Sequence, residues 1–329
     1  MKNTLLIFIV ILLFSCVDKK PKDPPLEKPM ASVKTYIPDN FIVRTVQTLT
    51  IELEYVSNAI QADRPTIVLL HGWPQSWYAY RKMMPLLHED FNVIALNLPG
   101  TGNSEPSLQG YDTKAIAVYL NAFLEALNIA SAHIVGHDVG AWVAYSFAKN
   151  HPEKTKTLTV MEGGIPGLAP IQKLAFTEKG NPRTWQFAFN QIDGLPEQLV
   201  TGREALYLKW FFDHKMVVRD AINDEDFEEY VSTFSKPETL KSGFDYYRAF
   251  NVSAEQNLNG KNSKLGMPVL AIGADGSLGK VMTTLMEPLC VNLRGTVIEN
   301  SGHYNLEEQP ETTTAELLTF IKKSDSTDF

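Results

Sequence analysis

Short runs of consecutive apolar residues recur along the chain, each about as long as a β-strand. A continuous apolar run is typical of a strand that is buried on both faces of a sheet. The predicted strands are Leu49–Val56, which alternates, and Thr66–Leu70, Phe91–Leu96, Ala132–Val135, Thr157–Met161, Val269–Ile272 and Thr296–Glu299. Helical spacing of apolar residues predicts helices over Tyr111–Leu127, Val139–Lys149, Gly279–Leu293 and Glu311–Ile321.

This alternation of strands and helices predicts an α/β fold, with a mainly parallel sheet covered by helices on both faces. The alternation stops between Met161 and Met267, where the pattern is helical and rich in aromatic residues. A stretch of that length is too long for a loop in a compact domain. We therefore expect a helical cap over 165–260, inserted into a sheet domain formed by 36–164 and 261–329.

The N-terminus has a different pattern, with Lys2 followed by the apolar run Leu5–Phe14. The run is too short to span a bilayer, which takes roughly 20 residues, but it suits the apolar region of a secretory signal. The segment Leu13-Phe14-Ser15-Cys16 resembles a bacterial lipobox, apart from its bulky Phe14. This resemblance implies a signal peptide over 1–15 and a lipid on Cys16. An ordinary signal peptide and a buried N-terminal strand are the alternatives.

The following segment, 16–35, is rich in proline and charge and predicts a flexible tether. With the lipid, it would anchor the chain to a membrane of the bacterial cell envelope, facing the periplasm or the cell surface. Cys290, the second of two cysteines, then has no disulfide partner, and we expect it on a helix face.

Composition and charge narrow the range of functions. Hydrophobic residues make up 44% of the chain and charged residues 21%, which excludes collagen-like and wholly disordered proteins. The chain has 30 Lys and Arg against 38 Asp and Glu, a formal net charge of −8, and no basic cluster stands out. We therefore expect no nucleic-acid partner. The oligomeric state stays open.

The strand Ala132–Val135 leads into Gly136-His137-Asp138-Val139-Gly140 and then into an apolar helix. This arrangement resembles the nucleophile elbow of α/β hydrolases, with Asp138 in the position that usually holds serine. Glycines on both sides let neighbouring backbones approach closely, and the helix N-terminus favours an anion. We predict that Asp138 is a nucleophile; the alternative is a simple helix N-cap.

Two further motifs supply partners for this carboxylate. The segment His71-Gly72-Trp73-Pro74 follows a predicted strand and resembles the turn that provides an oxyanion-hole N–H, here that of Trp73. The second N–H would come from Val139. The segment Ser301-Gly302-His303 follows the last predicted strand, where the base of such an enzyme lies, so His303 is the predicted base.

A carboxylate nucleophile changes the chemistry of the elbow. A serine alkoxide attacks acyl carbon, whereas a carboxylate attacks saturated carbon and becomes an alkyl ester. His303 would then activate a water molecule that attacks the carbonyl carbon of Asp138, while the N–H groups of Trp73 and Val139 bind the oxyanion. Asp138 therefore points away from esterases, lipases and proteases, and towards epoxide hydrolases and dehalogenases.

Six motifs together resemble the epoxide hydrolases of the α/β-hydrolase superfamily, nearest to their Cif-like branch. The similarity runs from about Phe41 to the C-terminus, and the motifs are HGWPQSW, GHDVG, MEGGIPG, WQFAF, FDYYRAF and SGHY. The resemblance implies an α/β-hydrolase fold with a helical cap, a small epoxide substrate and a vicinal diol product. It implies no metal and no cofactor.

The resemblance also implies which acid orients His303. Glu162 follows the strand after Asp138, at the spacing of the acid in Cif-like enzymes and fluoroacetate dehalogenases. Asp275 is the alternative acid. It lies close to the more common place for this acid but one residue early, and otherwise would be a turn residue.

In the cap, Tyr247 matches the tyrosine that donates to the epoxide oxygen in this family. Tyr246 is the alternative if the register is shifted, and packing within the cap is the simpler interpretation. Cif-like enzymes pair the tyrosine with a histidine that follows a tryptophan. Here Gln186 follows Trp185, and an amide donates a hydrogen bond but carries no proton at pH 7. We expect both residues beside the substrate.

A dehalogenase is the first alternative function. Haloalkane dehalogenases have a halide-binding tryptophan where this chain has Val139, and fluoroacetate dehalogenases have arginines where it has Val139 and Trp142. Without a cation at those positions, an anionic substrate would be poorly held. Trp142 and the cap aromatics instead predict an apolar substrate. A non-catalytic, ligand-binding relative is the second alternative, suggested by Gln186.

Overall fold

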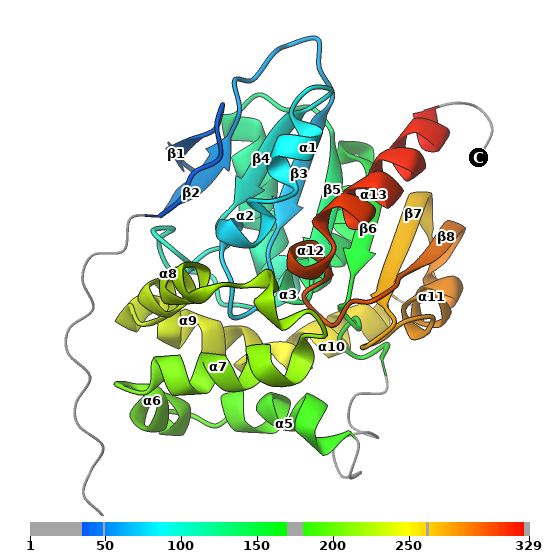
Figure 1. Cartoon of the computed structure of the whole chain (residues 1–329). Helices are drawn as coiled ribbons and strands as arrows, with labels where there is room; N and C mark the ends of the chain where they lie inside the picture. Colours follow the sequence, from blue (N-terminus) through cyan, green and yellow to red (C-terminus); the bar gives the residue numbers. More distant parts are fainter. Residues whose placement is uncertain (1–34, 49, 170–179, 261–262, 326–329) are drawn as a thin grey trace, which may run out of the picture.

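The computed structural model describes residues 35–48, 50–169, 180–260 and 263–325 (Figure 1). The predicted signal peptide, Cys16 and nearly all of the predicted tether lie outside these residues. Within the described ranges, no helix combines the length and the apolar character needed to cross a membrane.

One sheet of eight strands, counted over the described residues, runs through the molecule in the order β1-β2-β4-β3-β5-β6-β7-β8. β1 and β2 are antiparallel to their neighbours, and the strands from β4 to β8 are parallel. All residues of β3, β4 and β5 are buried, which requires cover on both faces of the sheet. The strands are β1 (Ile42–Gln47), β2 (Glu52–Ser57), β3 (Thr66–Leu70), β4 (Asn92–Leu96), β5 (Ala132–His137), β6 (Thr155–Met161), β7 (Leu265–Ala274) and β8 (Cys290–Ile298).

Helices provide this cover, with α2 packed against α3 and α1 against α13. The helices of the sheet domain are α1 (Met84–Leu87), α2 (Thr113–Ala126), α3 (Val139–Asn150), α11 (Val281–Met286), α12 (Asn305–Glu308) and α13 (Pro310–Asp325). Three 3-10 helices join them, namely η1 (Trp77–Tyr80), η2 (Pro152–Lys154) and η4 (Glu287–Leu289).

The cap lies between β6 and β7, as a layer of helices gathered below one end of the sheet in Figure 1. Its described helices are α5 (Asn181–Asn190), α6 (Leu195–Val200), α7 (Glu204–Lys215), η3 (Arg219–Ala221), α8 (Asp224–Phe234), α9 (Pro237–Arg248) and α10 (Phe250–Asn259). Aromatic rings fill the space between the cap helices; Trp185 of α5, for example, stacks on Phe211 of α7 with ring centroids 5.5 Å apart. Burial of these rings supplies much of the free energy that holds the cap together.

At the ends of the sheet, one strand was missed by the sequence pattern and one predicted helix is wrong. The sequence pattern missed the edge strand β1, whose side chains are mostly exposed and therefore form no apolar run. It also predicted one helix over Gly279–Leu293, but the helix ends at Met286 and β8 begins at Cys290. Pro288 explains the early end, because proline lacks the N–H that a continuing helix needs. Cys290 is thus a buried strand residue.

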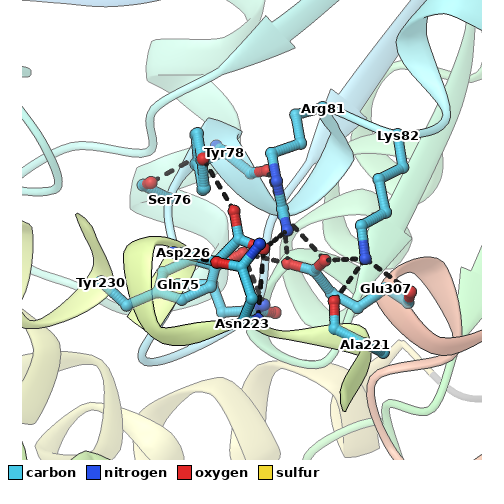
Figure 2. A network of polar contacts seen from close by, with 10 residues as sticks. All are labelled: Gln75, Ser76, Tyr78, Arg81, Lys82, Ala221, Asn223, Asp226, Tyr230 and Glu307. Carbon is cyan, nitrogen blue, oxygen red and sulfur yellow. Dashed lines mark hydrogen bonds and ion pairs between the residues drawn. The ribbon is translucent and has the colours of Figure 1, made fainter. Parts of the chain in front are cut away.

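A buried network of charges joins the cap to the sheet domain (Figure 2). Arg81, which follows η1, lies between Asp226 of α8 and Glu307 of α12, with N–O distances of 2.6 Å to each. Tyr78 donates a hydrogen bond of 2.9 Å to Asp226, and Tyr230 donates one to Glu307. Burial lowers the pKa of Arg81, but the two carboxylates outweigh that effect and raise it, so the guanidinium stays charged.

Candidate active site

Asp138 is the single residue between the end of β5 and the start of α3. Its backbone has φ 50° and ψ −116°, an unusual conformation for a residue with a side chain. The tight turn needs the flanking glycines. A Cβ on Gly136 would lie 2.3 Å from the carbonyl oxygen of Gly140, and a Cβ on Gly140 would lie 2.1 Å from that of Leu70. The predicted elbow geometry is thus present.

The carboxylate of Asp138 is held at both of its oxygens. Oδ1 accepts a hydrogen bond of 3.0 Å from the backbone N–H of Trp73, and Oδ2 lies 3.4 Å from Nε2 of His303. Burial raises the pKa of Asp138, but the hydrogen bond and the charge of His303 outweigh that effect and lower it to about 2. The carboxylate is therefore ionised, as a nucleophile must be.

The turn after β3 aims the Trp73 N–H at this carboxylate. His71 shapes the turn, because its Nε2 accepts a hydrogen bond of 3.2 Å from the N–H of Leu98 while Nδ1 lies 3.0 Å from the carbonyl oxygen of Gly72. Val139 is the first residue of α3, so its N–H has no carbonyl partner within the helix. Both predicted oxyanion donors thus border the nucleophile.

His303 lies in the loop between β8 and α12. Its Nε2 faces Asp138, and its Nδ1 lies 3.4 Å from Oε2 of Glu162. Its carbonyl oxygen accepts a hydrogen bond of 2.8 Å from His137, which fixes the loop. Burial lowers the pKa of His303, but the hydrogen bonds that its ring N–H groups donate to Asp138 and Glu162 outweigh this effect and raise the pKa above its ordinary value.

The structure brings Glu162, and not Asp275, to His303. Glu162 is buried, and its Oε1 accepts hydrogen bonds from the N–H groups of Ala274 at 2.7 Å and Leu278 at 3.3 Å. Asp275 is exposed and instead accepts hydrogen bonds from the backbone at positions 300 and 301, which lower its pKa. Asp275 therefore lies in the turn, and Glu162 is the carboxylate that contacts the imidazole.

The two candidate tyrosines of α9 point to different places. Tyr247 is buried, with its ring 5.2 Å from that of Trp73 and 5.9 Å from that of Trp142. Burial and then the charge of Asp138 raise its pKa, so the phenol keeps its proton. Tyr246 donates a hydrogen bond of 3.1 Å to the carbonyl oxygen of Pro99, so it anchors α9 to the sheet domain.

A cavity of about 200 Å³ opens over Asp138, Glu162 and His303. The rings of Trp142 and Phe187 form part of its wall. Its size and its mixture of aromatic walls with a few polar groups suit a small organic molecule. The described residues hold no cluster of His, Cys, Asp and Glu side chains arranged to bind a metal ion.

Two of the residues expected beside the substrate lie in different surroundings. Gln186 lines the cavity, and its buried amide oxygen has no hydrogen-bond partner within the described part of the chain. Trp185 does not line it; its ring lies 5.2 Å from that of Trp210 and belongs to the core of the cap. A contact of Trp185 with the substrate stays a prediction, and its ring points away from this cavity because neighbouring helical residues point in different directions.

Sequence reasoning missed two cations that line the cavity, Lys215 and Arg183. Lys215 ends α7, and its carbonyl oxygen accepts a hydrogen bond of 2.8 Å from the N–H of His303. Arg183 lies in the first turn of α5. Nothing in the local pattern separated these residues from the many surface cations of the chain.

The chain resembles several hydrolases. A family model described as the alpha/beta hydrolase fold matches residues 65–310. A soluble epoxide hydrolase from Corynebacterium sp. (strain C12) is 32% identical over 259 residues, covering 74% of this chain and 86% of that protein. The crystal structure of Cfl2 from Burkholderia cenocepacia is 39% identical with a TM-score of 0.83, covering 87% of this chain and 99% of that one.

A Cif enzyme has the same fold. The Cif epoxide hydrolase from Acinetobacter nosocomialis superposes with a TM-score of 0.80 at 23% identity, over 87% of this chain and 90% of that one. The matched part of this chain is longer than the two segments of the sheet domain together. The match therefore includes residues of the cap.

Proposed function

Since this chain belongs to the α/β-hydrolase fold family and to its epoxide hydrolases, we propose that it opens an epoxide to a vicinal diol through an alkyl ester on Asp138. The observation that carries the proposal is the placement of one carboxylate. Asp138 is ionised, buried and held between the N–H of Trp73 and the imidazole of His303. A carboxylate in that position attacks saturated carbon, and its ester is open to hydrolysis.

In the first step, Oδ2 of Asp138 attacks a ring carbon of the epoxide. The carbon–oxygen bond breaks, its electron pair goes to the ring oxygen, and that oxygen takes the phenolic proton of Tyr247. The raised pKa of Tyr247 keeps this proton in place until the oxygen becomes more basic than the phenolate. Oδ1 stays on the Trp73 N–H and becomes the carbonyl oxygen of the ester.

In the second step, Nε2 of His303 takes a proton from water, and the hydroxide attacks Cγ of Asp138. The N–H groups of Trp73 and Val139 bind the oxyanion that forms on Oδ1. The ester bond then breaks, and the departing oxygen takes the proton from His303. The carboxylic acid left on Asp138 returns a proton to Tyr247. The sum of both steps is one epoxide and one water giving one diol.

The body of the substrate would lie against the rings of Trp142 and Phe187. Both are apolar surfaces, and they favour an apolar substrate body through the hydrophobic effect. Gln186 would offer its amide to the substrate in place of the histidine found in Cif-like enzymes.

The first test traps the ester. The variant His303→Gln keeps the nucleophile and removes the base, so we expect turnover to fall by roughly 10²–10⁴-fold. The Asp138 ester should then accumulate, and mass spectrometry should find the peptide containing Asp138 heavier by the mass of the epoxide. The variant Asp138→Asn is the control and should gain no mass. Absence of any adduct across a broad panel of epoxides would contradict the proposal.

The same panel separates the alternative functions. A dehalogenase would release halide from haloalkanes with a higher kcat/KM than any epoxide gives, and Asp138→Asn would abolish that release. A non-catalytic ligand-binding protein would turn over neither class, and Asp138→Asn would bind its ligand as well as the unchanged protein does.

A further inference from the structure

Lys215 reaches the cavity beside three groups of the proposed mechanism. The residue is half-buried, and it lines the cavity together with Asp138, Glu162 and His303. Its backbone is fixed, because its carbonyl oxygen holds the N–H of His303 at 2.8 Å. Its Nζ lies 5.2 Å from the ring centroid of Phe211, which supports the ammonium by a cation–π contact.

Within the described ranges, the ammonium of Lys215 has no carboxylate within 4.0 Å and no hydrogen-bond acceptor. The nearby carboxylates are already occupied. Asp138 is held by Trp73 and His303, while Glu162 is held by His303 and by backbone N–H groups at the end of β7 and just after it. The N–H donors of Lys215 are therefore available to a molecule in the cavity.

Arg183 adds a second cation at the edge of the cavity. It is exposed, and within the described ranges its guanidinium makes one hydrogen bond, a donation from Nη2 to the carbonyl oxygen of Gly276 at 3.4 Å. The expectation that an anionic substrate would be poorly held depended on positions 139 and 142. The structure supplies cations from the cap helices α5 and α7 instead.

We infer that the natural substrate is an epoxide whose apolar body carries a carboxylate, and that Lys215 binds this carboxylate with Arg183 beside it. The inference depends on the proposed function for its epoxide. A single negative charge matches the one ammonium that the described residues place in the cavity lining. A dianion such as a phosphate monoester would be repelled more strongly by Asp138 and Glu162. The rings of Trp142 and Phe187 would hold the apolar body.

Burial lowers the pKa of Lys215 to about 8, while the charges of Asp138 and Glu162 act in the opposite direction. The ammonium is therefore largely charged at neutral pH. A bound carboxylate would raise this pKa again, because it replaces part of the lost solvation with an opposite charge.

The test uses two styrene oxides of the same shape, one with a para-carboxylate and one with a para-carboxamide. We expect the unchanged protein to prefer the carboxylate by about tenfold or more in kcat/KM, the worth of one charge-assisted hydrogen bond. The variant Lys215→Met should lose most of that preference. The variant Lys209→Met is the matched control, because Lys209 lies on the same helix with its side chain 64% exposed and paired with Asp213. It should keep the preference.

Two results would overturn the inference. One is an unchanged protein that turns over the carboxamide as well as the carboxylate. The other is an equal loss for both substrates in Lys215→Met, which would mean that Lys215 acts on the reaction and not on the charge of the substrate. Circular dichroism and thermal unfolding of each variant will show that the fold is intact.

A binding measurement separates this inference from the proposed function. Calorimetry with para-toluate and para-toluamide, which have no epoxide, compares the two charges without any turnover. A preference for para-toluate that Lys215→Met removes would support the carboxylate site at Lys215 even if no epoxide reacted, a result that would refute the proposed function and not this site. Equal binding of both compounds would overturn the inference even if epoxides did react.

Discussion

At the scale of single residues, His303 and Asp138 depend on each other for their protonation states. The pKa of His303 is raised because two carboxylates offset its burial. When Asp138 becomes an ester, its negative charge disappears and only Glu162 remains beside the imidazole. The pKa of His303 should then fall, which leaves the imidazole neutral when it has to accept a proton from water.

The pH dependence of the second step tests this coupling. We expect hydrolysis of the ester to be fastest at high pH and to slow as pH falls through the pKa of His303 in the ester. That midpoint should lie about one unit or more below the pKa of His303 in the free protein, because an adjacent opposite charge shifts a pKa by 1–3 units. Single-turnover kinetics give the midpoint for hydrolysis of the ester. NMR titration gives the pKa of His303 in the free protein. Coincident midpoints would contradict the coupling.

The residues of the site differ in how well the sequence reveals them. Asp138, Trp73 and His303 each sit in a short motif whose spacing from a strand marks it. Glu162 lies in the segment MEGGIPG, and its role could be predicted only through the resemblance to a family. Lys215 was hidden, because a lysine in the last turn of a helix is common for electrostatic reasons alone. Only the tertiary structure places it against the cavity.

At the scale of elements, the network around Arg81 joins η1, α8 and α12. These elements carry or adjoin three parts of the site. η1 follows the Trp73 turn, α8 belongs to the cap, and α12 follows His303. A change in the network should therefore affect the fold of the whole site region.

We expect Glu307→Gln to lower the free energy of unfolding by about 3 kcal/mol, because it leaves part of the buried charge of Arg81 uncompensated. Denaturant unfolding measures the loss. The control is Glu316→Gln, which breaks the ion pair between Glu316 and Arg294. Both side chains are about 30% exposed there, and such pairs contribute less than about 1 kcal/mol. Equal losses in the two variants would contradict a special role for the network.

Element boundaries were the weakest part of the sequence prediction. The buried parallel strands were found because their apolar runs are continuous. The end of α11 was missed because Met282, Met286 and Leu289 continue a helical spacing up to the strand β8, and periodicity alone gave too little weight to Pro288. The edge strand β1 was missed because its exposed side chains leave no hydrophobic pattern.

At the scale of the whole molecule, the order of strands and helices predicted the α/β fold and the place of the cap. The packing of the cap over the sheet could not be predicted in the same way. It depends on long-range contacts such as the one between Arg81 and Asp226, which no local pattern encodes.

The location of the protein is a separate prediction. We propose that the chain is cut before Cys16 and carries lipid on that residue. The variant Cys16→Ser should then leave the membrane fraction, and intact-mass measurement of the unchanged protein should show the lipid. Cys290→Ser is the matched control. Cys290 is buried in the sheet domain and is not the proposed lipid site, so this variant should stay with the membrane. Membrane association of Cys16→Ser would contradict the anchor.

Burial of Cys290 has a consequence for the redox chemistry of the protein. Burial raises the pKa of its thiol to about 12, so almost no thiolate is present at neutral pH. The thiolate is the species that oxidants and other cysteines react with, so this thiol, which forms no disulfide within the described part of the chain, is protected against oxidants. It becomes reactive only when β8 separates from the sheet, which makes the rate of Cys290 alkylation a direct reporter of that opening.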